Sequence, residues 1–130
     1  MRVAALLLGL LVLASCQVSR GFQENIELPH GTSSGTADAM VQAIWNGGAL
    51  TEKIRVQFPN FDPDAHPERY GIQLRRFTLS PVGGEEQVSL QLILQFADAS
   101  SDVPADVDGL VAFGKSIVER ERDDYLRGLQ

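Results

Sequence analysis

The chain has 130 residues, of which 44% are hydrophobic and 22% charged, and its formal net charge at pH 7 is −6. This length and composition are those of a single globular domain. The acidic balance and the lack of a Lys and Arg cluster argue against nucleic acid or a bare anionic lipid surface as partner, because both require clustered positive charge.

An uncharged apolar segment lies at the start of the chain. Met1-Arg2 gives a short positive beginning, and residues 3–15 are mostly Leu, Val and Ala. This segment is shorter than the roughly 20 residues that a membrane-spanning helix needs, and it has the length of the apolar part of a signal peptide. It ends in Leu13-Ala14-Ser15-Cys16, and Cys16 is the only cysteine in the chain. This ending resembles the lipobox of bacterial lipoproteins, in which an apolar residue and two small residues precede the cysteine.

The resemblance to bacterial lipoproteins implies that residues 1–15 are a cleaved signal peptide and that Cys16 carries a diacylglyceryl group, often with an acylated amino terminus. Two or three acyl chains hold a protein stably on a membrane, whereas one chain binds marginally. In the lipoproteins of enteric bacteria, an Asp after the cysteine marks retention in the inner membrane. Gln17 at that position therefore favours the periplasmic side of the outer membrane. The alternatives are an ordinary signal peptide with an incidental Cys16, or a cytosolic protein with an apolar N-terminal helix.

The first half of the mature chain predicts a tether, a short strand, a helix and a second strand. We expect residues 16–24 to be the tether and residues 25–29 the short strand. Apolar residues recur at helical spacing over residues 36–48, and Gly47-Gly48 supplies a stop signal. Residues 52–58 alternate, with apolar side chains on one side, as in a half-buried strand. These inward side chains are Ile54, Val56 and Phe58.

The second half predicts a loop, a hairpin and a long helix. Three prolines in residues 59–68 predict an exposed loop. Residues 69–80 predict a strand whose apolar side changes after Leu74, so we expect a one-residue bulge near Arg75 and Arg76. Residues 87–98 alternate most clearly and complete the hairpin. A helix of about 24 residues follows and ends near Leu126 to Leu129.

This order of elements predicts one α+β domain over residues 25–130. Two helices would cover one face of a three- to four-stranded antiparallel sheet, giving a two-layer sandwich.

Two groups of acidic residues are weak candidates for metal ligands. Asp62, Asp64 and His66 lie in "FDPDAHPE", where oxygen and nitrogen ligands on a loop could hold a divalent ion. The prolines set their spacing, and Asp-Pro is common turn chemistry, so we expect no metal there. A second group echoes part of a calcium loop, but helix capping explains it better. This second group consists of Asp102, Asp106, Asp108 and Gly109.

No catalytic motif is present in the sequence. His30 and His66 are the only histidines, and neither lies in a recognisable motif with a nucleophile. We therefore expect a protein that is not an enzyme and that has no cofactor.

Three arginines form the one concentrated basic feature, with Phe61 and Tyr70 nearby. Arg69, Arg75 and Arg76 could meet an acidic partner or the phosphates of lipopolysaccharide, because guanidinium groups pair with phosphate in a planar fork. The alternative is a solvated sheet face with no partner.

These observations favour a periplasm-facing lipoprotein that acts as a non-catalytic accessory or assembly component of an envelope complex. The element order resembles that of the lipopolysaccharide-assembly lipoprotein family of the outer membrane, where a helix, strands and a C-terminal helix follow a lipidated cysteine. In that family Gly-Phe tends to follow the cysteine directly, whereas Gly21-Phe22 comes five residues later here, so no binding residue is carried over. The resemblance implies that the sheet enters a barrel, with Arg75 and Arg76 as the first lipopolysaccharide contacts to test. The rival hypothesis is a free-standing binding module, either a hydrolase inhibitor or a carrier of a small apolar ligand.

Overall fold

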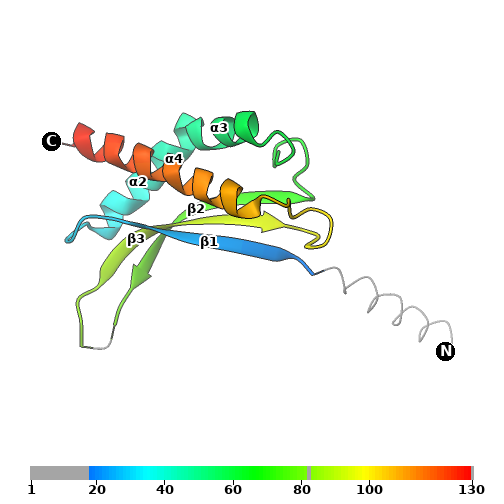
Figure 1. The fold of residues 1–130 in the computed structure, drawn as a ribbon. Helices are drawn as coiled ribbons and strands as arrows, with labels where there is room; N and C mark the ends of the chain where they lie inside the picture. The colour runs from blue at the N-terminus through cyan, green and yellow to red at the C-terminus, as the bar shows by residue number, and fades with distance from the viewer. Residues whose placement is uncertain (1–17, 82, 130) are drawn as a thin grey trace, which may run out of the picture.

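The protein forms a two-layer α+β fold in a computed structural model that describes residues 18–81 and 83–129. One layer is an antiparallel sheet in the order β1-β3-β2. The other layer consists of three helices on one face of the sheet (Figure 1). The predicted fold class is therefore confirmed, with three helices where we expected two. The strands are β1 (Arg20–Glu27), β2 (Tyr70–Leu79) and β3 (Gln87–Phe96), and the helices are α2 (Ser34–Gly47), α3 (Ala49–Gln57) and α4 (Val107–Gly128).

Strand β3 lies at the centre of the sheet and supplies much of the core. Its even-numbered apolar side chains face the helices, as their alternation predicts. Leu90, Leu92, Leu94 and Phe96 are buried, together with residues of all three helices. The core therefore lies between the helices and one face of the sheet.

The hairpin of β2 and β3 contains no bulge. Its register is continuous from Tyr70 opposite Phe96 to Leu79 opposite Gln87, so the predicted bulge near Arg75 and Arg76 is wrong. The register stays continuous because a bulge would bring little extra burial. The apolar residues beyond Arg76 lie near the end of the hairpin, and Leu79 is 51% exposed. Arg75 and Arg76 consequently point to opposite faces of the sheet.

Strand β1 begins earlier than the sequence pattern predicts. It starts at Arg20, so the second half of the expected tether, residues 16–24, belongs to the sheet. Phe22 and Ile26 face the helices, but Glu24 lies between them on the same face. The Glu24 carboxylate is 3.6 Å from the Lys115 ammonium of α4. This charged side chain interrupts the alternation on which the sequence-based boundary depends.

Helix α3 replaces the strand predicted over residues 52–58. Leu50 and Ile54 are each 1% exposed, whereas Val56 is 76% exposed, which is the pattern of a helix rather than a strand. Gly48, with φ of +73°, ends α2 and allows α3 to begin at once. The predicted stop at Gly47-Gly48 is therefore correct, but the chain continues as a second helix.

Helix α4 packs closely on α3 and the sheet. Asp106 caps it by accepting a hydrogen bond from the Gly109 N–H at 3.3 Å. A Cβ at Gly114 would lie 3.0 Å from Leu92 and 3.6 Å from Ile54, so the missing side chain permits this approach. The predicted long helix is confirmed.

We expect two truncations in α3 to have very different costs. Ile54→Ala removes buried atoms and should lower the free energy of unfolding by about 2–5 kcal/mol. Val56→Ala should change it by less than about 0.5 kcal/mol, because this side chain is exposed. Urea unfolding of both variants measures the difference. Similar costs for the two variants would support the alternating strand and contradict the helix.

Candidate interaction surface

The face of the sheet opposite the helices is uncovered by any element that the structure describes, and we call it the open face. Side chains alternate along a strand, and residues directly opposite in an antiparallel pair share a face. The registers therefore place the odd-numbered residues of β1, β2 and β3 on the open face. In Figure 1 the helices all lie on the other side.

The open face is rich in amides and poor in charge. Six of its fourteen residues are Gln or Asn, and only two residues, Glu27 and Arg75, carry a charge. Amide side chains both donate and accept hydrogen bonds, so this face suits a polar contact more than an apolar one.

A hydrogen-bond network centred on Gln91 joins all three strands across the open face. Gln91 is only 4% exposed. Its Oε1 accepts from the Arg75 Nε–H at 2.8 Å, and its Nε2 donates to Gln23 at 3.2 Å and Asn25 at 3.4 Å. A buried amide with all these partners holds its neighbours in one arrangement. The network therefore fixes the Arg75 guanidinium on this face.

The three arginines singled out from the sequence do not form one cluster. Arg76 lies on the helix side, where its Nε donates to Asp38 at 3.0 Å and its Nη1 donates to Thr78 at 2.7 Å. Arg69 precedes β2 and donates from Nε to Asp102 at 2.8 Å. Within residues 18–81 and 83–129, Arg75 has no carboxylate within ion-pair distance. Arg75 is thus the one of the three that keeps charge available for a partner.

The Arg69–Asp102 pair fastens the loop after β3 to the start of β2. The Asp102 side chain is 5% exposed, and its carboxylate also accepts from the Asp98 N–H at 3.0 Å. The hydrogen bond with Asp102 raises the pKa of Arg69 above its ordinary value. In the same loop, the Ser100 hydroxyl and N–H lower the pKa of Asp98. Both groups are therefore charged at neutral pH, and their role is to hold the loop.

The weak metal candidates are occupied by turn contacts. The Asp62 Oδ1 accepts from the N–H groups of Asp64 and Ala65, each at 3.2 Å, and the His66 Nδ1 lies 3.4 Å from the Glu68 Oε1. In the described ranges, no three His, Cys, Asp or Glu side chains form a group that could hold a metal ion. Phe61 packs in the core, with its ring centroid 5.3 Å from that of Tyr70.

The residues that echo a calcium loop also have local contacts. Asp106 caps α4, Asp108 lies in the first turn of that helix, and Asp102 binds Arg69. The capping explanation is therefore confirmed for Asp106.

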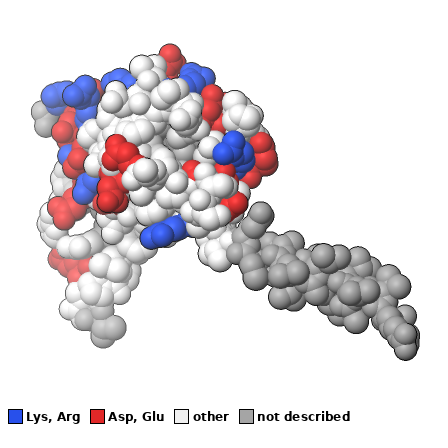
Figure 2. Space-filling model, turned by 45° about the vertical axis from the view of Figure 1, so that its right-hand side comes forward, with Lys and Arg blue, Asp and Glu red and all other residues white. Residues whose placement is uncertain are grey.

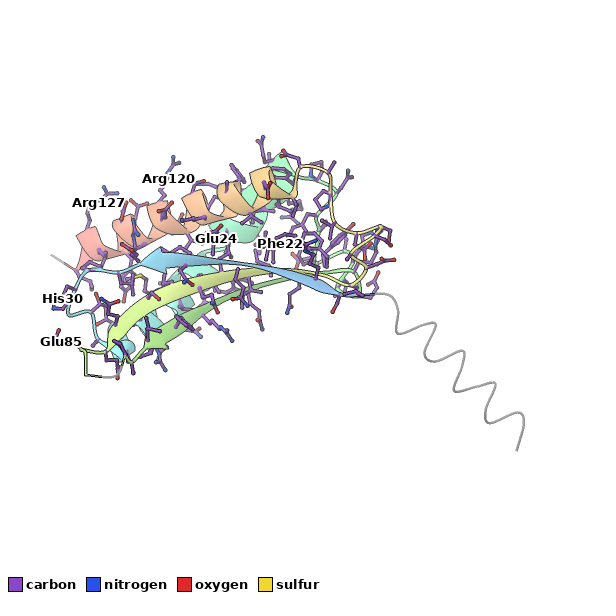
Figure 3. All side chains as sticks on the ribbon, turned by 60° about the horizontal axis from the view of Figure 1, so that its bottom comes forward. Phe22, Glu24, His30, Glu85, Arg120 and Arg127 are labelled. Atoms are coloured by element: carbon purple, nitrogen blue, oxygen red, sulfur yellow. The ribbon has the colours of Figure 1, made fainter. Side chains whose placement is uncertain are left out.

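Two hollows lie at opposite ends of the sheet. The hollow of about 320 Å³ at the start of β1, which we call the proximal hollow, is lined by Arg20, Gly21 and Gly71 among others. The hollow of about 310 Å³ at the far end lies between the loop after β1 and the hairpin, and Glu27 and Phe77 help to line it. Near that end the His30 Nε2 lies 3.3 Å from the Glu85 Oε2, joining the two loops (Figure 3).

The lipobox, including Cys16, lies outside the described residues. Among the residues described, no helix is both long and apolar enough to cross a membrane. Comparisons of the chain with protein-family models, with curated proteins and with solved structures found no match. The candidate surface therefore rests on the chemistry of its own residues.

Sequence reasoning missed the Gln91 network. The sequence does contain a sign of it, because amide residues occupy open-face positions in both β1 and β3. Placing Gln23 and Asn25 beside Gln91, however, requires knowing that β1 begins at Arg20.

We expect Asp102→Asn to destabilise the protein by about 1–3 kcal/mol. The substitution removes the charge of a buried acceptor, while its two donors, the Arg69 guanidinium and the Asp98 N–H, stay in place. Asp38→Asn is the matched control, since the Asp38–Arg76 pair is exposed and should be worth less than about 1 kcal/mol. Thermal and urea unfolding measure both. Equal effects would contradict the structural role of Asp102.

Proposed function

We propose that this protein is a lipid-anchored, periplasm-facing accessory or assembly component of an envelope complex, and that it is not an enzyme. The sequence Leu13-Ala14-Ser15-Cys16 supports the lipid anchor, and Gln17 supports the outer membrane. In this proposal the domain contacts its partner through the open face.

The orientation of Arg75 is the observation that carries this proposal. Gln91 holds the Nε side of the guanidinium, so the remaining N–H groups of Arg75 can bind an acceptor from outside. Because the side chain is already ordered, less rotamer entropy is lost when a partner binds. A guanidinium pairs best with a carboxylate or a phosphate, so the partner should present one of these groups.

The amide-rich surroundings support a polar protein contact. Antiparallel sheets often leave one face in water, so an uncovered face alone has no functional meaning. Here, however, Gln91 and Ile93 are buried on this face, and Gln91 accepts a hydrogen bond from the Arg75 guanidinium. Most of the residues around them on the open face are polar. Interfaces commonly have a packed centre and a polar rim.

A protein with acidic side chains and lipopolysaccharide with its phosphates both supply the acceptor that Arg75 requires. The element order, which resembles that of the lipopolysaccharide-assembly lipoproteins, supports lipopolysaccharide assembly as the setting. Arg76 is a weaker candidate contact than Arg75, since it is paired with Asp38 on the helix side.

The second candidate function, a carrier of a small apolar ligand, has less support. Both hollows are lined in part by charged side chains, including Arg20 and Glu68 in one and Glu27 and Glu86 in the other. An apolar ligand would leave these groups without solvent or partner, which is costly.

We expect Arg75→Glu to abolish most partner binding. Losing a desolvated charged contact typically costs about 2–5 kcal/mol, which corresponds to about 30-fold or more in affinity. Arg75→Lys should retain part of the affinity, because Lys keeps the charge but not the fork. The measurement is quantitative capture of envelope proteins from detergent-solubilised membranes by the tagged, lipidated protein.

Arg120→Glu is the control, since Arg120 is an exposed arginine of α4 on the helix side (Figure 3). Circular dichroism checks that each variant is folded. The proposal fails if Arg75→Glu and Arg120→Glu capture the same partner equally. A bound apolar ligand with no stoichiometric protein would instead support the carrier.

A further inference from the structure

We propose that the outer edge of β2 receives one extended strand of the envelope partner, and that this strand carries an Asp or Glu opposite Arg75. The inference deepens the proposed function and rests on it, because it describes how the partner reaches the open face. In strand addition, backbone hydrogen bonds give affinity, and the side chains that flank them give specificity.

The hydrogen-bond pattern of the hairpin shows which backbone groups of β2 point away from the sheet. The register sets Arg69 opposite Ala97, one step beyond the Tyr70–Phe96 pair, and the Arg69 carbonyl accepts from the Ala97 N–H at 2.9 Å. In an antiparallel ladder, hydrogen-bonded pairs alternate with pairs that are not hydrogen-bonded. The odd-numbered residues of β2 therefore bond to β3, and the even-numbered residues turn their N–H and C=O groups to the outer edge.

Most of these outward groups have no hydrogen-bond partner. The Tyr70 N–H donates to the His66 carbonyl at 3.0 Å, so the loop before β2 covers its first position. In the part of the chain that the structure describes, nothing is hydrogen-bonded to the backbone groups of the next four even-numbered residues, which are Ile72, Leu74, Arg76 and Thr78. Figure 2 shows that the end of the β2–β3 hairpin projects from the rest of the domain, as in Figure 1. A strand could therefore add here without displacing a hydrogen bond.

The outer edge of β1 is less available. Strand β3 turns its odd-numbered residues to β2 and its even-numbered residues to β1, so the odd-numbered residues of β1 point outward. In agreement, the Glu27 carbonyl accepts from the Nη1 of Arg122, on α4, at 2.8 Å. Lys115 of the same helix pairs with Glu24, an inward charge of the kind that protects edge strands. Helix α4 thus holds β1 at two places, and β2 is the edge that remains for a partner.

The position of Arg75 determines what the added strand must carry. In an antiparallel addition, which is the more stable pairing per residue, the residue opposite Arg75 belongs to a pair that is not hydrogen-bonded. Side chains are closest in such pairs, whose Cα atoms are about 4.5 Å apart. A carboxylate at this position would lie on the open face beside a guanidinium that has no other carboxylate in the described ranges. Opposite charges paired across strands stabilise a sheet.

The neighbouring Arg76 makes no such demand on the partner. Its side chain lies on the helix side, where Asp38 accepts from Nε and Thr78 accepts from Nη1. These contacts hold the side chain against the domain, while the Arg76 backbone groups point outward. The charge that selects the added strand is therefore that of Arg75.

A second copy of this chain does not supply the required carboxylate. Strand β2 contains no Asp or Glu, so every antiparallel register of β2 against itself leaves Arg75 opposite a neutral or positive side chain. Like charges directly opposite each other destabilise a sheet. An acidic strand of a different protein is therefore favoured over a homodimer.

The test is hydrogen exchange at single-amide resolution, read by NMR. It compares the lipidated protein alone with its complex with the envelope protein that it captures from detergent-solubilised membranes. In the free protein, the outward amides of β2, from Ile72 to Thr78, should exchange faster than the inward amides of Gln73 and Arg75. In the complex, the outward amides of β2 should slow at least several-fold, whereas the outward amides of β1 should not change.

A proline substitution tests the same edge by a second route. Thr78→Pro removes an N–H that β3 does not use, which an edge strand tolerates. Thr78→Val keeps this N–H and is the matched comparison. We expect Thr78→Val to capture the partner at least several-fold better than Thr78→Pro, and thermal unfolding checks that both are folded. Ile72→Pro replaces Thr78→Pro if that variant is unfolded. Equal capture by the folded proline and valine variants would overturn the strand addition.

The outcomes distinguish this inference from the proposed function. The absence of a stoichiometric partner contradicts the proposed function, and this inference with it. A partner that is lost with Arg75→Glu, but that leaves the outward amides of β2 unchanged, overturns only the strand addition. Protection of these amides in the purified protein alone, increasing with concentration together with a dimer mass, would assign the edge to a second copy and overturn the acidic partner strand.

Discussion

Strand β3 is hydrogen-bonded to β1 on one side and to β2 on the other, so the whole sheet depends on it. Its buried even-numbered residues form the surface on which the three helices pack. Its odd-numbered residues include Gln91, whose amide joins the three strands on the open face. A two-residue period in one strand therefore determines both the hydrophobic layer and the polar surface.

The elements with long, uniform patterns could be predicted from the sequence. Strand β3 alternates over ten residues and α4 keeps its apolar stripe over several turns, so both were correct and the α+β class followed. Helix α3 has only nine residues, and a short segment with apolar Ile54 and Phe58 four positions apart fits either period. In β1, Glu24 occupies an inward position that only its Lys115 partner, on a distant helix, explains.

The candidate surface was less predictable because it depends on contacts distant in sequence. Arg69, Arg75 and Arg76 are close in sequence, but a strand without a bulge places Arg75 and Arg76 on opposite faces. Arg69 is paired with Asp102, and Arg76 is paired with Asp38. Gln91 is more than 60 positions from Gln23 and Asn25, and amides form no motif that a sequence pattern reveals. Of the three arginines, only Arg75 lies on the open face, in a hydrogen-bond network that only the fold brings together.

The proposed anchor and the proposed partner contact involve different parts of the same sheet. Lipidation would fix the end at Arg20, and the partner contact requires the centre around Arg75 to stay accessible. The most direct test is site-specific photo-crosslinking in the native envelope, with the photoreactive residue at Gln73 on the open face or at Ser116 on the exposed side of α4. We predict one dominant adduct from position 73 and none from position 116. The reverse pattern, or the same adduct from both positions, would contradict the assignment of the open face as the partner surface.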